Sequence, residues 1–211
     1  MDLLGERWTL LVIRELLLGA TTFTEIKGGL PRIPRATLSD RLAKLERAGI
    51  LDTSKGGYRL TEAGLALADV VRDLALWATI TESASLREED LDAAALTWDI
   101  QRRVDQHALP DRLVVLEIEF TDRPKSDRRF WLHLSPSKVD LCRQDTGAPV
   151  DVWIAAPLEP VTRWWLGEFS WSELTSRSDV DVHGDLDLRR HMDRWFLRYI
   201  FTAQALGIAV H

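Results

Sequence analysis

The sequence predicts an α+β protein built as two domains, and three observations support this. The chain has 211 residues, which at roughly 100 to 150 residues per compact domain leaves room for two modest domains. Apolar residues recur with the period of a helix through the first 82 residues, whereas several stretches beyond residue 113 alternate as strands do. Residues 1–82 balance 11 basic against 11 acidic side chains, so the net charge of −6 belongs to the second half. We expect domains at 1–82 and 90–211.

Composition excludes several classes of protein. Apolar residues make up 45% of the chain and charged residues 28%, which is typical of folded cores and not of disorder. No apolar run reaches the roughly 18 to 20 residues of a membrane span, and the start MDLLGERW lacks a basic region. The single cysteine, Cys142, excludes an intramolecular disulfide and a cysteine-based zinc site. We expect a cytoplasmic protein with no membrane partner.

The first domain opens with two helices. Residues 3–18 place apolar side chains on a wide face, and Gly19 suits the left-handed residue just beyond a helix end. A shorter helix starts at Thr22 and ends at the glycines and proline of 28–31. Both helices are expected to be buried on most sides.

A third helix is predicted over 35–48, with one face for the core and one free. Leu38, Leu42 and Leu45 repeat at spacings of four and three, while the outward residues near its start are small and polar. Residues 27–59 carry a net charge of +5. An isolated helix of this kind would ordinarily be a solvated face, but its surroundings favour nucleic acid. The residues expected to contact DNA are Arg32, Arg35, Thr37, Ser39, Arg41, Lys44, Lys55 and Arg59.

A two-stranded wing follows this helix. A strand begins at Ile50, the glycines of 54–57 permit a tight turn, and residues 58–60 return as the partner strand. Thr61 then caps a helix whose apolar stripe continues to Ala78. That stripe is longer than a small domain needs, so part of it is expected to pack on a second subunit or on the second domain. The pattern is that of a winged helix-turn-helix.

Three segments in order, DLLGERWTLLVIRELLLG, RATLSDRLAKLERAGI and YRLTEAG, resemble the HxlR-type winged-helix transcriptional regulators, relatives of the MarR group. The resemblance implies a homodimer that binds a double-stranded, pseudo-palindromic DNA operator through two recognition helices in neighbouring major grooves. Two departures are evident. Pro34 and Arg35 stand where the family usually has a serine cap and proline, and the sensing cysteine that many members carry before the first helix is absent.

The second domain reads as an antiparallel sheet with packed helices. A helix is expected over 91–104, then a meander of strands at 113–120, 128–134 and 138–144. A further strand at 151–155, short helices at 158–165 and 171–175, a strand through Val180 and Val182, and a closing helix over 188–206 complete the prediction.

Residues 151–196, with VWIAAPLEPVTRWWLGEFSW and DVDVHGDLDLRRHMDRW, are similar to the end of a sterol carrier protein type 2-like domain. That resemblance implies an α+β domain with a hydrophobic tunnel. Seven of the nine tryptophans lie in this half of the chain, and simple core filling is an equally open interpretation. Candidates for the tunnel lining are Trp131, Trp153, Trp164, Trp165, Trp195 and Phe196; candidates for an anionic head group, which could instead meet solvent or acids, are Arg163, Arg189, Arg190 and Arg194.

No catalytic or metal-binding pattern is present in the sequence. The five histidines show no metal spacing, and the loop DVDVHG from Asp179 lacks the acid that a calcium loop needs at position 190, which is Arg190. We therefore expect no enzyme activity, metal or cofactor. The leading interpretation is a DNA-binding transcriptional regulator whose second domain senses a hydrophobic or amphipathic small molecule. The alternatives are a lipid or sterol carrier that uses the winged helix for assembly, and a regulator whose second domain only dimerises.

Overall fold

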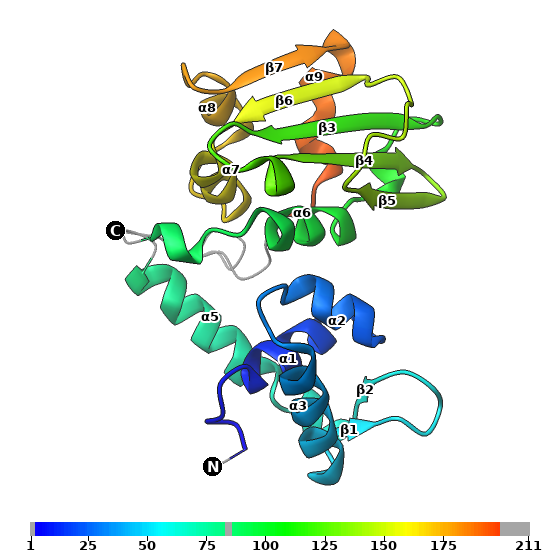
Figure 1. Cartoon of the computed structure of the whole chain (residues 1–211), viewed down its shortest axis with the longest axis vertical. Coiled ribbons are helices and arrows are strands. Elements are labelled where there is room, and N and C mark those ends of the chain that lie inside the picture. The colour runs from blue at the N-terminus through cyan, green and yellow to red at the C-terminus, as the bar shows by residue number, and fades with distance from the viewer. Residues whose placement is uncertain (1–2, 83–85, 199–211) are drawn as a thin grey trace. The chain divides into compact units, whose positions relative to one another are not determined.

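The structure, a computed structural model, describes residues 3–82 and 86–198. The chain separates into two compact units, residues 1–81 (unit 1) and 82–211 (unit 2). Unit 1 is helical with one small hairpin, and unit 2 is a five-stranded sheet with helices, so the predicted α+β class is confirmed (Figure 1).

Unit 1 is a winged helix-turn-helix. Its elements are α1 (Thr9–Leu17), α2 (Phe23–Gly29), α3 (Arg35–Arg47), β1 (Leu51–Asp52), β2 (Arg59–Leu60), α4 (Glu62–Leu65) and α5 (Ala68–Glu82). Its core contains Val12, Ile13 and Ile26, which pack with the three leucines predicted on the inner face of α3, all at most 3% exposed. Strands β1 and β2 pair antiparallel as the wing.

The turns and caps of unit 1 follow the predicted chemistry. Thr22 caps α2 in a reciprocal capping box with Glu25, whose pKa is held below its usual range mainly by the backbone N–H of Thr21. Thr61 accepts a hydrogen bond of 3.2 Å from the N–H of Gly64 at the start of α4. Gly19 adopts a φ of +94°, as the sequence predicts for a residue beyond a helix end.

Two helices of unit 1 differ from the prediction. The first begins at Thr9 and not at residue 3, because Trp8 has a φ of +80°, a left-handed conformation that a right-handed helix cannot contain. The helix predicted after Thr61 is interrupted by a turn at residues 66–67, so its apolar stripe is carried by α4 and α5 in succession.

The sheet of unit 2 has the order β5-β4-β3-β6-β7 (Figure 1). The strands are β3 (Val114–Phe120), β4 (Arg129–Ser135), β5 (Lys138–Cys142), β6 (Val152–Ala156) and β7 (Asp181–Gly184). The antiparallel expectation is correct for three of the four neighbouring pairs, but β3 and β6 are parallel. The sequence could not show this, because β6 follows β5 in the chain yet pairs on the far side of β3.

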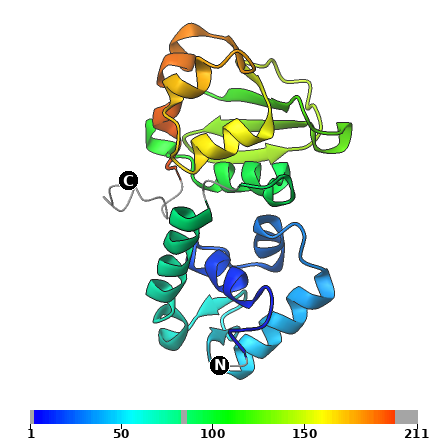
Figure 2. The ribbon, with the colours of Figure 1, turned by 90° about the vertical axis from the view of Figure 1, so that its left-hand side faces the viewer.

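One face of this sheet is covered by helices (Figures 1 and 2). These are α6 (Ala93–Arg102), α7 (Leu158–Trp165), α8 (Trp171–Thr175) and α9 (Leu186–His191). Alternate strand residues such as Leu116, Leu132 and Ile154 point into the core beneath them. The strand, two short helices, second strand and start of a closing helix that the sequence predicts after residue 150 are present as β6, α7, α8, β7 and α9, and Gly167 lies between α7 and α8.

The predicted closing helix over 188–206 is wrong in the described residues. Helix α9 ends at His191, one 3₁₀ turn follows over Met192–Trp195, and Phe196 is extended. Phe196 pairs in a β-bridge with Val104, and Arg103 donates a 2.8 Å hydrogen bond to the carbonyl of Leu197. These contacts bury Trp195 and Phe196 in the core, which a continued helix would not achieve. Residues 199–206 of the predicted helix lie outside the described residues.

Candidate DNA interface and ligand site

Helix α3 presents its outer face to solvent, as predicted. Ala36, Ser39 and Ala43 are exposed and Thr37 is half-buried, while the leucine face is buried. The helix has no side-chain cap because its N-cap residue is Pro34, so no side chain satisfies the N–H groups of its first turn. Small side chains together with uncapped N–H donors allow the sugar–phosphate backbone of a nucleic acid to approach closely.

Two of the predicted DNA-contacting cations are held in an ion-pair cluster. Arg41 contacts Glu6 at 2.6 Å and donates to the carbonyl of Arg7 at 3.0 Å, while Lys44 contacts Glu6 at 2.9 Å and Asp40 at 3.1 Å. The hydrogen bond from Lys44 lowers the pKa of Asp40, and those to Glu6 and Asp40 raise the pKa of Lys44. The cluster fastens the segment before α1 to α3 and neutralises both cations.

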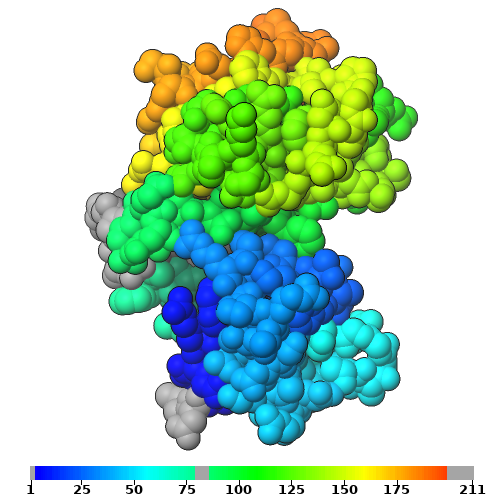
Figure 3. All heavy atoms as spheres, viewed as in Figure 1, coloured from blue at the N-terminus to red at the C-terminus, as the bar shows by residue number. Residues whose placement is uncertain are grey.

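The remaining predicted cations lie at the start of α3 and in the wing. Arg32 and Arg35 are exposed, and the guanidinium of Arg35 lies 5.0 Å from the ring centroid of Phe23, a cation–π contact that orients it. Lys55 and Arg59 are exposed on the wing, which projects from the surface of unit 1 in cyan in Figure 3. The turn that joins β1 to β2 contains Gly56 and Gly57, which adopt φ angles of +72° and +76°.

Helix α5 carries an exposed apolar stripe. Val70, Leu74 and Trp77 are spaced by four and three residues and are 49%, 46% and 59% exposed. About a quarter turn around the same helix, Val71 is only 5% exposed and joins the core of unit 1. The stripe is therefore an uncovered surface on a helix that is otherwise anchored.

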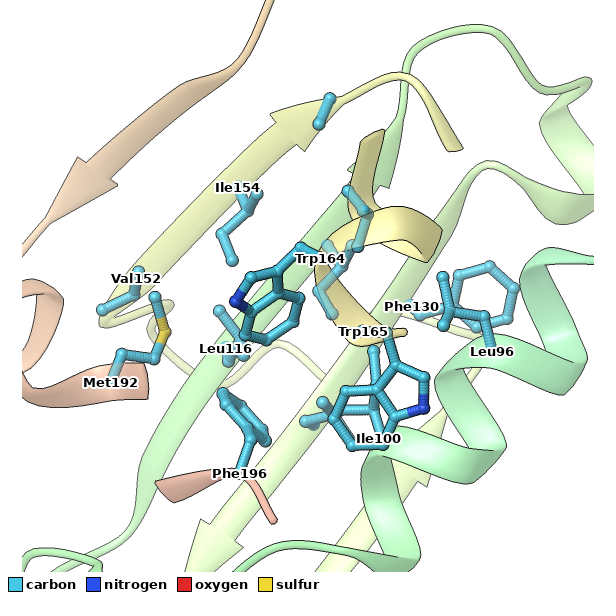
Figure 4. Packing of buried hydrophobic residues seen from close by; sticks show 14 of the residues in the cluster. Leu96, Ile100, Leu116, Phe130, Val152, Ile154, Trp164, Trp165, Met192 and Phe196 are labelled. Carbon is cyan, nitrogen blue, oxygen red and sulfur yellow. The ribbon is translucent and has the colours of Figure 1, made fainter. Parts of the chain in front are cut away.

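The six aromatic residues predicted to line one tunnel lie on two faces of the sheet. Trp164, Trp165, Trp195 and Phe196 are in the helix-covered core (Figure 4). Trp131 and Trp153 are one residue out of phase with the core-facing positions of β4 and β6, so they lie on the opposite face. A single cavity cannot reach all six. The residue types suggested a shared pocket, but the alternation of side chains along β4 and β6 puts Trp131 and Trp153 on the other face.

The core itself is closely packed. Its internal cavity has a volume of about 10 Å³, near the lower limit for holding one water molecule. Among the predicted lining residues Trp164 and Phe196 border it, together with Trp171. The indole N–H of Trp165 donates to Asp99 at 2.8 Å, whereas that of Trp164 has no partner and faces Val152, Ile154 and Met192 (Figure 4). An apolar ligand would have to displace core side chains to enter.

A larger cleft of about 320 Å³ lies at the surface between α8, β7 and α9. Arg189 and Arg190 line it, and Trp171 contributes to both this cleft and the internal cavity. Of the other arginines considered for an anionic head group, Arg163 is already paired with Glu159 at 2.9 Å and Glu168 at 2.6 Å, and Arg194 is exposed outside the cleft. Trp171, one of the seven tryptophans of this half, was not among the predicted lining residues; it begins α8 after the cap Ser170.

Comparison with known proteins decides the family. Residues 3–85 match the family described as HxlR-like helix-turn-helix. The regulator YvaP of Bacillus subtilis, described as an uncharacterized HTH-type transcriptional regulator, is 35% identical over 86 residues, which is 37% of this chain and 80% of YvaP. The chain belongs to the HxlR family.

A second regulator of B. subtilis matches a similar share of the chain. The HTH-type transcriptional regulator YodB of B. subtilis is 37% identical over 84 residues, which is 36% of this chain and 75% of YodB. The crystal structure of quinone-bound YodB matches with 39% identity, a TM-score of 0.34, and coverage of 36% of this chain and 88% of that chain. This HxlR protein is accordingly a DNA-binding transcriptional regulator in its first unit, as predicted.

A solved structure described as "UbiJ-SCP2 Ubiquinone synthesis protein" is also similar. It is 14% identical with a TM-score of 0.34, and the match covers 62% of this chain and 92% of that chain. Likeness at this level carries no information on a ligand.

Within residues 3–82 and 86–198 the HxlR protein has no group of three or more histidine, cysteine or acidic side chains placed to hold a metal ion. None of the helices in that part of the chain is long and apolar enough to cross a membrane.

Glu117 lies on the face of the sheet opposite the helices (the open face), and its pKa is shifted there. Strand pairing sets it directly between Trp131 and Trp153, and its pKa is raised above the usual range because burial penalises the charged form. Arg129, 3.6 Å away, opposes the shift but also pairs with Glu119 at 2.9 Å. The guanidinium therefore keeps an anionic partner if Glu117 is neutralised.

Glu117→Gln is expected to stabilise the protein at neutral pH and not in acid. Because the folded-state pKa is raised, the folded protein binds the proton more tightly than the unfolded chain does. The stabilisation from this residue is therefore fully present below the pKa of Glu117 in the unfolded chain, and it is lost as pH rises through the pKa of Glu117 in the folded protein. Denaturant unfolding of both proteins at about pH 7 and about pH 4 measures the difference.

Glu173→Gln is the control, because the pKa of Glu173 is shifted in the direction opposite to that of Glu117. The Ser170 side chain and N–H lower the pKa of Glu173, so its contribution is lost as pH falls. An increase in stability for Glu117→Gln that is equal at both pH values would contradict the account of Glu117.

Proposed function

We propose that the protein regulates transcription as a homodimer, with α3 and the wing of each unit 1 on a double-stranded operator and unit 2 as the sensor of an amphipathic small molecule. The observation that carries the DNA part is the outer face of α3, which is small, polar and uncapped beside the exposed Arg32 and Arg35. This geometry suits insertion of the helix start into a major groove.

The roles proposed for the basic residues differ. Arg35 and the wing residues Lys55 and Arg59 are exposed and suit phosphate contacts, and Thr37 and Ser39 suit base edges. Arg41 and Lys44 already carry carboxylate partners, so we assign them chiefly to holding the orientation of α3. Contact of these two with DNA would require them to exchange Glu6 for a phosphate.

Arg35→Ala combined with Lys55→Ala should weaken operator binding and its dependence on salt. Each lost phosphate contact lowers the slope of log affinity against log salt by about one, and we expect an affinity loss of roughly tenfold or more at low salt. The measurement is fluorescence anisotropy with a duplex selected from a random library, repeated over a series of salt concentrations.

Lys125→Ala is the matched control, because Lys125 is an exposed lysine of unit 2. It should leave both the affinity and the slope unchanged. If the double variant bound with the wild-type slope, α3 and the wing would not be the phosphate-contacting surface.

The stripe of Val70, Leu74 and Trp77 supports the proposed homodimer. A contiguous apolar face on an anchored helix is the usual mark of a protein interface, and a second copy would bring an identical face to it. Leu74→Glu should yield monomers in sedimentation and lower operator affinity, because two half-sites would no longer be bound together.

Leu113→Glu introduces the same charge at a leucine of unit 2 that is 50% exposed, against 46% for Leu74. It should leave the mass in solution unchanged. A Leu74→Glu protein that still sediments as a dimer would place the interface elsewhere.

Sensing by unit 2 is supported by a surface cleft that shares an aromatic wall with an apolar cavity. A ligand regulates only if it binds the DNA-competent and DNA-incompetent states with different affinity. Titration of amphipathic small molecules into an operator gel shift should change operator affinity by roughly fivefold or more. If ligands shown by tryptophan fluorescence to bind leave that affinity unchanged, unit 2 is not a sensor.

A further inference from the structure

The cleft between α8, β7 and α9 combines two guanidinium groups with apolar walls. Its volume of about 320 Å³ falls in the lower range of small-molecule sites, which is roughly 300 to 1,000 Å³. No acidic side chain is among its lining residues, so the charge of the lining is wholly positive. The residues are Trp171, Ser172, Thr175, Val182, Leu186, Arg189 and Arg190.

Arg189 is a cation without an anion. Its Nε is buried and makes no hydrogen bond, and across the described residues none of its guanidinium nitrogens has an ion-pair partner. Arg123 and Arg128 also have a buried Nε without a hydrogen bond, but they pair with Glu88 and Glu119. A buried donor nitrogen without a hydrogen bond is unfavourable, and the unsatisfied Nε of Arg189 therefore points to a missing partner.

Two hydrogen bonds fix the main chain of Arg189 at the cleft. The indole N–H of Trp171 donates to the carbonyl of Arg189 at 3.3 Å, and the N–H of Arg189 donates to the carbonyl of Asp185 at 3.0 Å. Arg190 adds a second guanidinium on the same rim, exposed to solvent. Two planar donor groups that line one cleft suit the oxygens of a carboxylate, sulfate or phosphate.

The rest of the cleft suits an apolar chain. Leu186 is 53% exposed at its edge, and Val182 is half-buried in its wall. Trp171 also borders the internal cavity, and its ring centroid lies 5.4 Å from that of Trp164, so one indole contributes to the walls of both spaces.

We propose that this cleft binds an amphipathic organic anion, with the acidic head group on Arg189 and Arg190 and the apolar chain against Trp171. The inference rests on the proposed sensing function of unit 2 and adds to it the charge of the ligand and the place where it binds. An uncharged or cationic amphiphile of equal length would leave Arg189 unpaired and should bind more weakly.

The test compares decanoate, decanol, decyltrimethylammonium and acetate by calorimetry on the full chain, below micelle-forming concentrations and without DNA. We expect decanoate to bind roughly tenfold or more tighter than decanol, with decyltrimethylammonium and acetate weaker still. Arg189→Gln with Arg190→Gln should remove the preference for decanoate and leave decanol binding within about twofold.

Arg194→Gln is the matched control, because Arg194 is exposed on the neighbouring 3₁₀ turn and does not line the cleft. It should keep the preference. Arg189→Lys, which retains the charge, should keep part of the preference for decanoate. If the double variant does not fold, Arg190→Gln alone is used instead, because it changes only an exposed residue, and it should reduce the preference.

Several results would overturn the proposal: equal affinity for decanoate and decanol, binding of acetate as tight as that of decanoate, no binding of any probe, or a preference that survives loss of both arginines. Because these affinities are measured without DNA, they are independent of regulation. Equal affinity for decanoate and decanol, together with a ligand that shifts operator affinity, would remove the anion site and leave the sensing function intact. A preference for decanoate without any change in operator affinity would keep the anion site and remove the sensing function.

Discussion

Burial of Leu38, Leu42 and Leu45 fixes the rotation of α3 about its own axis, and with it everything that unit 1 can present to DNA. The three side chains are at most 3% exposed and pack against α1 and α2. A helix anchored along one face must expose the opposite one, so Ser39 and Ala43 face solvent as a consequence of core packing. The carboxylate of Glu6 adds a second restraint by pairing with Arg41 and Lys44 on the flank of the same helix.

In unit 2 the equivalent constraint is strand alternation. Every second residue of β3, β4 and β6 enters the helix-covered core, and the residues between them form a separate face that contains Glu117. This alternation places Trp131 and Trp153 on the face of the sheet opposite the helix-covered core. It also leaves the cleft beside α9 as a site independent of the open face.

The sequence was sufficient wherever local chemistry decides the structure. The leucine spacing of α3, the cap at Thr61 and the glycines of the wing each gave the correct element, because each depends on neighbours within a few residues. The left-handed Trp8, the parallel pairing of β3 with β6, and the end of α9 at His191 depend on distant partners, and periodicity does not report these. The site followed the same rule: exposure of the α3 face was predictable, whereas the engagement of Lys44 by Glu6, 38 residues earlier in the chain, was not.

If unit 1 contacts DNA and unit 2 recognises the ligand, regulation requires a coupling free energy between the two units. Such coupling is reciprocal: a ligand that changes operator affinity must itself be bound with an affinity that the operator changes by the same factor. The most direct measurement is calorimetric titration of decanoate into the full chain with and without a saturating operator duplex. We expect the two dissociation constants to differ by roughly fivefold or more. Identical dissociation constants in the presence and absence of the operator would contradict a coupling between the units.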